Sequence, residues 1–301
     1  MYHNPVLLKE CIEGLDIQEN GIYVDATFGG GGHTEEIVKK LNNGKLIAFD
    51  QDKDAINNKQ ESKNLKIIHA NFRYMRRILT EQGFTKVDGI LADLGVSSHQ
   101  IDTPERGFST RFNAALDMRM DSNSVITAAE IVNTYPVARL QKMFSAYGEV
   151  TNAATLSRTI GDARQHKKIN TTSELIIAIE KCVPHHGANK YLAQVFQSLR
   201  IEVNQEVDSL KDLLRESKDV LKEGGKLVVI SYHSLEDRLV KNYMRYGNFE
   251  GIPDKDVYGR ERSPFKPLTK KPIEATDEEI GQNSRSRSAK LRIAERIAIA
   301  S

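Results

Sequence analysis

Three aspartates and a run of glycines are the residues of this sequence that could most plainly do chemistry. Gly29–Gly32 stand in a row within DATFGGGGHT, Asp25 precedes them, and Asp50 and Asp93 end two later apolar segments. Glycine lets a backbone turn sharply and approach a ligand without a Cβ in the way, and a carboxylate about 20 residues past such a loop can accept hydrogen bonds from both ribose hydroxyls. The pattern predicts a nucleotide site. A tight strand-to-helix turn would explain the glycines alone, and an ordinary surface acid would explain Asp50 alone.

The residues around the glycines narrow the choice of ligand. No Gly-Lys-Ser/Thr follows them, so the loop is not a phosphate-binding P-loop, and His33 stands where the lysine would be. Asp50 suits NAD and an adenosyl ligand equally well. Asp25 is placed to orient a loop that faces a cationic amino-acid moiety, and ADLGVSS places Asp93 where a methyl acceptor would lie. These two features favour S-adenosylmethionine over NAD, although neither decides alone.

Alternating strands and helices must position these residues. Four β-rich segments are predicted to be strands, over residues 21–27, 44–50, 65–71 and 87–95. The segments HTEEIVKKL, DKDAINNKQE and FRYMRRILTEQG between them are predicted to be helices, the first of them capped by Thr34. This alternation is typical of right-handed βαβ units around a parallel sheet, which binds ligands beyond the carboxyl ends of its strands.

The pattern changes after SSHQID. Residues 103–121 show no clear period and are predicted to be a long loop, and the chain from about Thr127 to Asn204 is predicted to form five helices, with a Thr171–Glu174 capping box on the fourth. The sheet then resumes. EVDSLKDLLRESKDVLKEGG is predicted to be an amphipathic helix closed by Gly224 and Gly225, KLVVISYH a strand, LEDRLVKNYMR a helix and AKLRIAERIAIA the last strand, with an irregular segment over 246–272. We therefore expect a methyltransferase-type α/β domain over 1–102 and 204–301, interrupted by a helical substrate-recognition domain over 103–203.

Composition excludes several classes of protein. The 301 residues are 39% hydrophobic and 28% charged with a net charge of +2, as in an ordinary globular protein. The two cysteines, Cys11 and Cys182, form no CxxC pair, which speaks against a disulfide framework or a zinc site. No apolar run approaches the roughly 20 residues of a membrane span, and we do not expect the segment MYHNPVLLKE to be a signal peptide. We expect a cytoplasmic protein.

Seven motifs in a fixed order resemble those of a known family. DATFGGGGHT, FDQD, ADLGVSSHQID, ERGFS, LDMRMD, SYHSLEDR and SRSRSAKLRIAER are similar to the motifs of the ribosomal RNA small subunit methyltransferase H family, and the likeness covers essentially the whole chain. The resemblance implies a class I S-adenosylmethionine-dependent methyltransferase, with a Rossmann-like, mostly parallel sheet and an inserted helical domain. It implies methylation of the N4 exocyclic amine of a cytidine in the decoding region (P site) of 16S rRNA.

Carried over by position, the resemblance also implies the cofactor contacts. They are Gly31, Gly32, His33, Asp50, Phe72, Asp93 and Gln100. Phe72 opens the helix after the third strand, where its ring could pack on the adenine or simply belong to the core. Two places depart from the family pattern: NAA stands where Asp-Gly-Pro is usual before LDMRM, and Gln194 stands where an arginine is usual. These departures leave the cofactor assignment intact and put the RNA contacts of the insertion in question.

The expected reaction needs placement and a proton acceptor. An exocyclic cytosine amine is a poor nucleophile, so holding it in line with the methyl group is the main task, and that alignment supplies roughly 7–11 kcal/mol in the best model systems. Asp93 and the hydroxyls of Ser97 and Ser98 are the candidate acceptors of the amine proton. Related amino-methylating enzymes carry an Asp/Asn-Pro-Pro-aromatic loop here, whereas this chain has DLGVSS, so another group must hold the base.

Two other patterns have simpler explanations. Ser231, His233 and Asp237 in SYHSLEDR suggest a hydrolase triad, but no G-x-S-x-G elbow accompanies them, and Ser234 with Asp237 is better interpreted as a helix cap with an acid in the first turn. His185 and His186 have no partners at metal-ligand spacing, so we expect loop histidines and no metal.

Basic residues suggest where RNA would bind. They gather late in the chain and in DARQHKK of the insertion: Arg260, Arg262, Lys266, Lys270, Lys271, Arg285, Arg287, Lys290 and Arg292, then Arg164, Lys167 and Lys168. Arginine beside small polar donors suits phosphate oxygens, although a solvated charged face is the alternative for each cluster. The expected partner is 16S rRNA or the small ribosomal subunit, with a homodimer possible by resemblance. An NAD-type oxidoreductase and a non-catalytic RNA-binding assembly factor are the rival functions.

Overall fold

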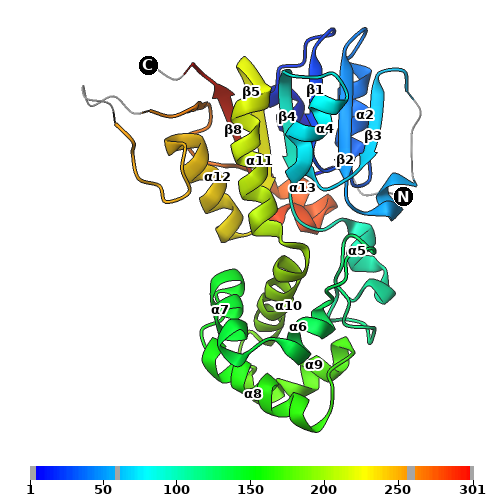
Figure 1. The fold of residues 1–301 in the computed structure, drawn as a ribbon, viewed down its shortest axis with the longest axis vertical. Helices are drawn as coiled ribbons and strands as arrows, with labels where there is room; N and C mark the ends of the chain where they lie inside the picture. Colours follow the sequence, from blue (N-terminus) through cyan, green and yellow to red (C-terminus); the bar gives the residue numbers. More distant parts are fainter. Residues whose placement is uncertain (1–4, 58–61, 256–261, 299–301) are drawn as a thin grey trace. The chain divides into compact units, whose positions relative to one another are not determined.

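The computed structural model describes residues 5–57, 62–255 and 262–298 (Figure 1). The chain divides into two compact units, the first made of residues 1–95 and 207–301 and the second of residues 96–206. The second unit is thus inserted into the first. It begins before the sequence-predicted boundary at residue 103, so that Ser97 and Gln100 belong to it.

The first unit is built on one eight-stranded sheet. Its strands are β1 (Ile22–Asp25), β2 (Lys45–Asp50), β3 (Leu65–His69), β4 (Val87–Asp93), β5 (Leu221–Ser231), β6 (Phe265–Pro267), β7 (Ile273–Glu274) and β8 (Lys290–Arg296). The order is β3-β2-β1-β4-β5-β8-β6, with β7 also pairing with β8. The first five strands run parallel and β8 runs antiparallel to β5. The mostly parallel α/β fold predicted from the alternating pattern is confirmed.

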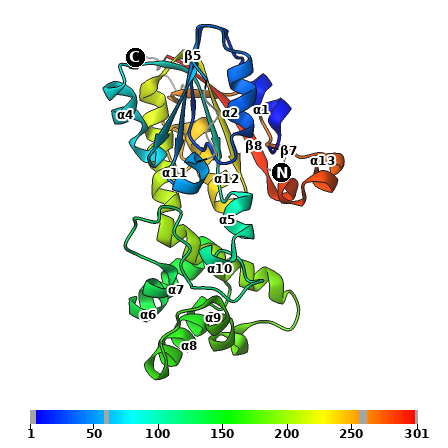
Figure 2. The same ribbon diagram turned by 90° about the vertical axis from the view of Figure 1, so that its right-hand side faces the viewer.

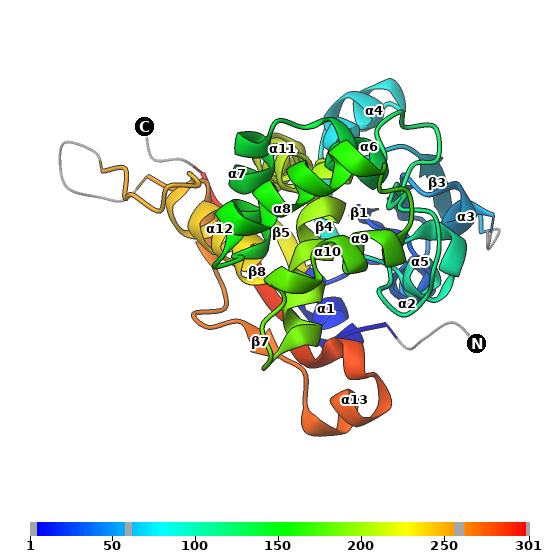
Figure 3. The ribbon, with the colours of Figure 1, turned by 90° about the horizontal axis from the view of Figure 1, so that it is seen from below.

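Helices cover both faces of this sheet. They are α1 (Leu8–Leu15), α2 (Gly32–Lys39), α3 (Lys53–Ile56), α4 (Met75–Glu81), α11 (Glu206–Val220), α12 (Ser234–Tyr246) and α13 (Asp277–Gln282), with 3₁₀ turns η1 (Phe72–Tyr74) and η4 (Ser284–Ser288). Figures 2 and 3 show α1 and α2 on one face and α4 and α11 on the other. Apolar side chains of α1, α2 and the central strands form the core beneath the first pair, among them Cys11, Ile37, Leu46, Leu91 and Val228. Burial of such side chains on both faces explains why the strands are continuous apolar runs.

Several predicted element boundaries were wrong. The helix expected to end at Gly224 and Gly225 ends at Val220, because β5 already begins at Leu221. The two glycines lie within the strand, next to a shift of register between Val87 and Gly89 of β4, and Gly224 has a φ of +80°.

Other segments gained or lost regular structure. The predicted loop after residue 102 carries the 3₁₀ turn η2 (Pro104–Arg106), which follows α5 (Ser98–Asp102). The helix expected over DKDAINNKQE is α3, with residues 58–61 outside the described part of the chain. The segment expected to be irregular over 246–272 contains β6, which pairs with β8.

The second unit is helical. Besides α5 it contains α6 (Ala128–Thr134), α7 (Val137–Gly148), α8 (Ala153–His166), α9 (Thr172–Ala178), η3 (Glu180–Cys182) and α10 (Ala188–Asn204). The longest of them, α10, packs against α6 and α7, and α8 packs against α7 and α9 (Figure 3). Their apolar faces share a core of their own, with Leu140, Phe144, Leu156, Val195 and Leu199 all fully buried or nearly so. The predicted Thr171–Glu174 capping box is confirmed at the start of α9.

Candidate functional site

Three carboxylates end three neighbouring parallel strands of the first unit. Asp25 ends β1, Asp50 ends β2 and Asp93 ends β4. In the ladder, Asp25 lies opposite Ala48 of β2 and Leu91 of β4, so the three side chains are offset by only about two residues along the same edge. This is the edge at which open parallel sheets bind ligands.

Asp25 holds the glycine loop together and is itself almost fully buried. Its Oδ1 accepts a hydrogen bond from the backbone N–H of Thr27 at 3.0 Å, and its Oδ2 accepts one from the Thr34 hydroxyl at 2.7 Å. Burial raises the pKa of Asp25, against the lowering effect of these bonds. Thr34 is therefore not the helix cap that the sequence predicted: the N-cap of α2 is Gly31. Because Asp25 is only 1% exposed, it can orient the loop but offers a ligand no surface.

The glycines of the loop are required for different structural reasons. Gly29 and Gly31 have φ values of +52° and +80°, which a side chain would strain. Gly32 has no such φ, but a Cβ there would lie 2.9 Å from the ring carbon Cγ of Pro5. The loop is thus shaped partly by its own turn and partly by the N-terminal segment packed against it.

Asp50 is tied to the same loop. Its Oδ2 accepts the backbone N–H of Gly29 at 2.8 Å, and its Oδ1 accepts the N–H of Asp52 at 2.8 Å. Burial raises the pKa of Asp50 to about 6, even though both backbone bonds act to lower it. Each carboxylate oxygen can accept a second hydrogen bond, so the side chain is oriented and can still receive two hydroxyl donors.

Asp93 is approached from three elements. Its backbone N–H donates to the Thr27 hydroxyl at 2.7 Å, the Tyr232 hydroxyl donates to its Oδ1 at 2.7 Å, and Nδ1 of His33 lies 3.8 Å from its Oδ2. Burial raises the pKa of Asp93, while His33 and Tyr232 act to lower it. With 23% of its side chain exposed, Asp93 can reach a ligand, whereas the buried Asp25 cannot.

The proton on Nε2 of His33 follows from its partner. Its Nε2 lies 3.0 Å from the carbonyl oxygen of Val6, which can only accept, so Nε2 carries a proton. Nδ1 then faces the Asp93 carboxylate at a distance too long for a direct hydrogen bond. The ring is buried and links the N-terminal segment to the strand edge.

Comparison with known proteins assigns the chain. A model of the MraW methylase family matches residues 1–297. The chain belongs to this family. Ribosomal RNA small subunit methyltransferase H of Cytophaga hutchinsonii is 56% identical over 298 residues, covering 98% of this chain and 100% of that protein. The protein of the same name from Flavobacterium johnsoniae is 55% identical over 297 residues, covering 98% of each. Among solved structures, a putative methyltransferase from Streptococcus mutans in complex with SAH matches with 15% identity and a TM-score of 0.41, over 99% of this chain and 100% of that one.

As a member of the MraW methylase family, the protein is a methyltransferase whose cofactor is S-adenosyl-L-methionine. Its sheet is mostly parallel, with the strand order β3-β2-β1-β4-β5-β8-β6 and helices on both faces (Figures 2 and 3). The residues at the strand edge fit this cofactor: Asp50 has lone pairs for two ribose hydroxyls, and the loop at Gly31 brings bare backbone to the start of α2.

The remaining sequence-predicted cofactor and catalytic residues have identifiable local roles. Phe72 is partly buried and begins η1, directly after Asn71, whose side chain caps that turn. Ser97 and Gln100 form a reciprocal capping box at the start of α5: the Gln100 backbone N–H donates to the Ser97 hydroxyl at 3.2 Å, and the Ser97 backbone N–H donates to the side-chain Oε1 of Gln100 at 3.0 Å. Both lie in the second unit, so the described contacts of the strand edge do not include them.

The SYHSLEDR motif of the methyltransferase does not form a triad. The Ser231 hydroxyl lies 3.4 Å from the Lys290 carbonyl, and Asp237 pairs with Arg292 at 2.6 Å. His233 is the N-cap of α12, accepting the N–H of Glu236, so the predicted cap at Ser234 was wrong. The residue of this motif that reaches the site is Tyr232, which the sequence analysis did not single out.

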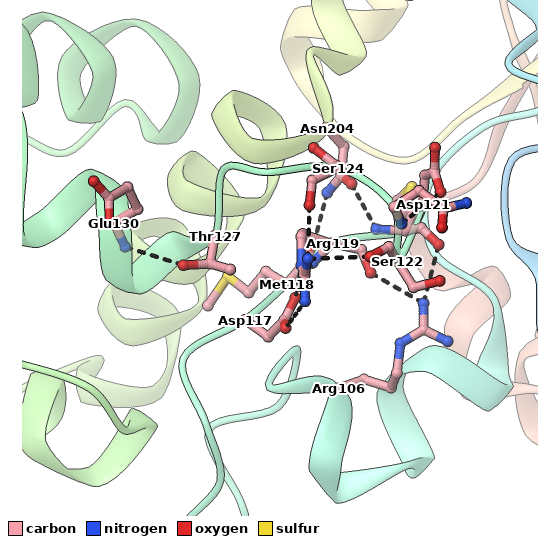
Figure 4. A network of polar contacts seen from close by, with 12 residues as sticks. Arg106, Asp117, Met118, Arg119, Asp121, Ser122, Ser124, Thr127, Glu130 and Asn204 are labelled. Carbon is pink, nitrogen blue, oxygen red and sulfur yellow. Dashed lines mark hydrogen bonds and ion pairs between the residues drawn. The ribbon is translucent and has the colours of Figure 1, made fainter.

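A polar network fixes the LDMRMD segment of the second unit (Figure 4). Arg119 makes a two-pronged ion pair with Asp117, with nitrogen–oxygen distances of 2.8 and 2.7 Å. Although burial opposes it, the Arg119 guanidinium holds the pKa of Asp117 below its usual range. Arg106 donates to the carbonyls of residues 119 and 120, and Asn204 donates to that of Met118. Met118 is buried with a φ of +63°, a backbone geometry that this network stabilises.

The contacts of the NAA segment before LDMRMD explain why this departure from the family pattern is tolerated. The Ala114 N–H donates to the Thr172 hydroxyl at 3.1 Å, and the Thr172 N–H donates to the Ala114 carbonyl at 2.9 Å. Both contacts of Ala114 use backbone atoms, which any residue but proline could supply.

Among the described basic residues, some are exposed and others are bound to partners within the protein. Arg292 is buried and paired with Asp237, so its expected role in RNA binding was wrong. Arg164 donates to the Val132 carbonyl and Lys167 pairs with Glu174. Arg260 lies outside the described residues. Exposed positions are Lys168, Arg262, Lys266, Lys270, Lys271 and Arg287.

Two negative findings apply to the described ranges. Over residues 5–57, 62–255 and 262–298, no cluster of three or more His, Cys, Asp or Glu side chains could hold a metal ion. Within these same ranges, no helix has both the length and the apolar composition that crossing a bilayer requires.

Proposed function

We propose that this protein transfers a methyl group to the N4 amine of a cytidine in the decoding region of 16S rRNA. The observation that carries the proposal is full-length similarity to ribosomal RNA small subunit methyltransferase H at 56% identity. The N4 position and the P-site cytidine come from the motif resemblance. The oriented carboxylates at the strand edge are compatible with that chemistry.

The strand edge supplies the cofactor contacts in this proposal. Asp50 accepts both ribose hydroxyls, the backbone at Gly31, Gly32 and His33 lies against the amino-acid end, and Phe72 packs on the adenine. Asp93 faces the reacting end because its carboxylate is partly exposed and has a fixed orientation. By the motif resemblance, Gln100 is a further cofactor contact and the second unit recognises the RNA. When bound, S-adenosylmethionine supplies a methyl group already activated on a sulfonium.

Asp93 is the proton acceptor in this proposal. The cytosine amine must lose a proton as it gains the methyl group, and a carboxylate with a raised pKa is a better base than one at its usual value. Ser97 is the second candidate, but its hydroxyl oxygen already accepts the Gln100 N–H. A cytidine stacked in its RNA must first be extruded, at a cost of a few kcal/mol.

The test is mass spectrometry of rRNA nucleosides after incubation with isotopically labelled S-adenosylmethionine. Small-subunit particles and naked 16S rRNA are offered in parallel. Label in N4-methylcytidine supports the proposal, and label in another nucleoside or none contradicts it.

Asp93→Asn should lower turnover by 10²-fold or more, the size expected for a general base. Asp88→Asn, at the opposite end of β4, is the matched control. Binding of RNA without any transfer would favour the assembly-factor alternative.

A further inference from the structure

The strongest unassigned feature of the site is the hydrogen bond between Tyr232 and Asp93. The Tyr232 hydroxyl donates to Oδ1 at 2.7 Å, linking residues 139 positions apart in the chain. On its other side, Asp93 faces the buried His33 ring. The carboxylate therefore has one oxygen fixed by a neutral donor, while the other is turned toward an imidazole.

Tyr232 is itself held from two directions. Its backbone N–H donates to Oε2 of Glu236 at 3.0 Å, and Oε1 of the same carboxylate lies 3.1 Å from Nε2 of His233. Its ring packs against the backbone at Gly95, where a Cβ would come within 3.2 Å of the ring and where φ is +100°. His233 also caps α12 through Nδ1. The polar residues of this motif thus fix the tyrosine.

We propose that Tyr232 is a positioning residue for methyl transfer: it holds the Asp93 carboxylate in its working orientation and ionised form. His233 and Glu236 support it by fixing the start of α12. The assignment rests on the proposed function of Asp93 as a group that contacts the cofactor and takes up the proton.

The charged surroundings of Asp93 set the direction of the expected effect. The titratable groups that face it come from four elements and the loop before α12: Cys11, Asp25, His33, Tyr232 and Glu236. Burial is the main cause that raises the pKa of Asp93, and Asp25 and Glu236 add to it, whereas His33 and the Tyr232 hydrogen bond oppose it. Burial beside Asp93 also raises the pKa of Tyr232, so its hydroxyl remains a donor at every working pH.

Removal of this hydroxyl should therefore shift a pH profile. In Tyr232→Phe the pKa of Asp93 rises, so the pH below which cofactor affinity and turnover fall moves upward. At neutral pH we expect turnover to drop roughly tenfold, the size seen when a partner that orients a ligating side chain is lost, with partial recovery at higher pH. The matched control is Tyr23→Phe, a buried tyrosine whose hydroxyl accepts the Gln18 N–H. It should leave the profile in place.

A double-mutant cycle tests whether Tyr232 acts through Asp93. S-adenosylmethionine affinity by calorimetry and single-turnover rates are measured for wild type, Tyr232→Phe, Asp93→Asn and the double variant. We expect the double variant to match Asp93→Asn, since no carboxylate remains for the tyrosine to keep ionised. Equal effects of Tyr232→Phe in both backgrounds, or an unshifted pH profile in a folded Tyr232→Phe protein, would overturn the proposal.

The readouts separate the two levels of inference. Calorimetry measures the cycle without any RNA, so a failure to methylate 16S rRNA would contradict the proposed function and leave the role of Tyr232 measurable. Conversely, the effects of Tyr232→Phe and Asp93→Asn could simply add in the double variant while wild-type protein methylates rRNA normally. That result would contradict the role of Tyr232 and leave the proposed function intact.

Discussion

Asp50 carries a prediction about pH. Its pKa of about 6 in the folded protein lies above the usual value of 3.8, because burial penalises the charged form. Ribose hydroxyls donate to the ionised carboxylate, so cofactor binding should release a proton near pH 6 and weaken as the pH falls below 6. Calorimetry in buffers of different ionisation enthalpy measures that proton. Its absence in wild type would contradict the ribose contact.

The raised pKa of Asp50 also affects the stability of the folded protein, but here the favourable contribution falls as the pH rises. Since the folded state binds the proton more tightly, the contribution is fully present below about pH 4 and is lost as the pH rises through about 6, with a slope of at most about 1.4 kcal/mol per pH unit. Asp50→Asn should abolish this slope and the proton release together. It should also leave one of the two backbone N–H donors facing an amide NH₂.

At the scale of residues, sequence alone located what local spacing determines. Glycines and acids at strand ends follow from periodicity and turn chemistry, so Gly31, Asp50 and Asp93 could be placed at one edge in advance. Tyr232 could not, because its partner lies 139 residues away. In its motif the serine, histidine and aspartate attracted notice as familiar catalytic types, whereas the decisive contact depends on how β4 and β5 pair.

The start of α2 gives a prediction about an element. In Gly32→Ala the added Cβ would meet Pro5 at 2.9 Å and push the segment whose Val6 carbonyl accepts the His33 N–H. We expect a loss of about 1–3 kcal/mol in stability and weaker cofactor binding, measured by thermal melts and calorimetry. Pro5→Ala in the same chain should restore part of both, because it removes Cγ and Cδ of residue 5 but leaves its Cβ, which lies 3.1 Å from the added Cβ. Gly281→Ala on α13, where a Cβ meets nothing within 4 Å, is the control.

Elements were predicted well where periodicity is long and poorly where tertiary pairing intervenes. The amphipathic pattern of α11 continues past Val220, but Leu221 pairs with Val87 in the sheet, and this pairing ends the helix early. The short α1 was not anticipated, although its residues Cys11 and Leu15 are buried against the sheet. Short elements of this kind depend on what covers them.

At the scale of the whole molecule, two arginines of the late basic segment should behave differently. Arg287 is exposed, so Arg287→Glu should leave the melting temperature unchanged and reduce the salt dependence of RNA binding by about one phosphate contact. Arg292→Met should leave the partly buried Asp237 without its partner and cost up to about 3 kcal/mol of stability. Melts and RNA titrations at several salt concentrations distinguish them. Equal losses of stability would contradict this division.

Sequence could reveal the helical insertion because composition and period change around it, and each unit has its own core. It could not separate the basic residues available to RNA from those used internally. Arg292 looks like its neighbours in SRSRSAKLR until β8 is paired with β5 and brought beside α12.

The insertion also affects how the chain folds during its synthesis. β4 and β5 are hydrogen-bonded neighbours, yet the ribosome must release residues 96–206 between them. The first four strands therefore emerge with the edge of β4 uncovered, and pairing across so long a stretch is intrinsically slow. The helices of residues 96–206 are contiguous in sequence and rich in local contacts. We therefore expect them to fold before β5 pairs with the exposed edge of β4.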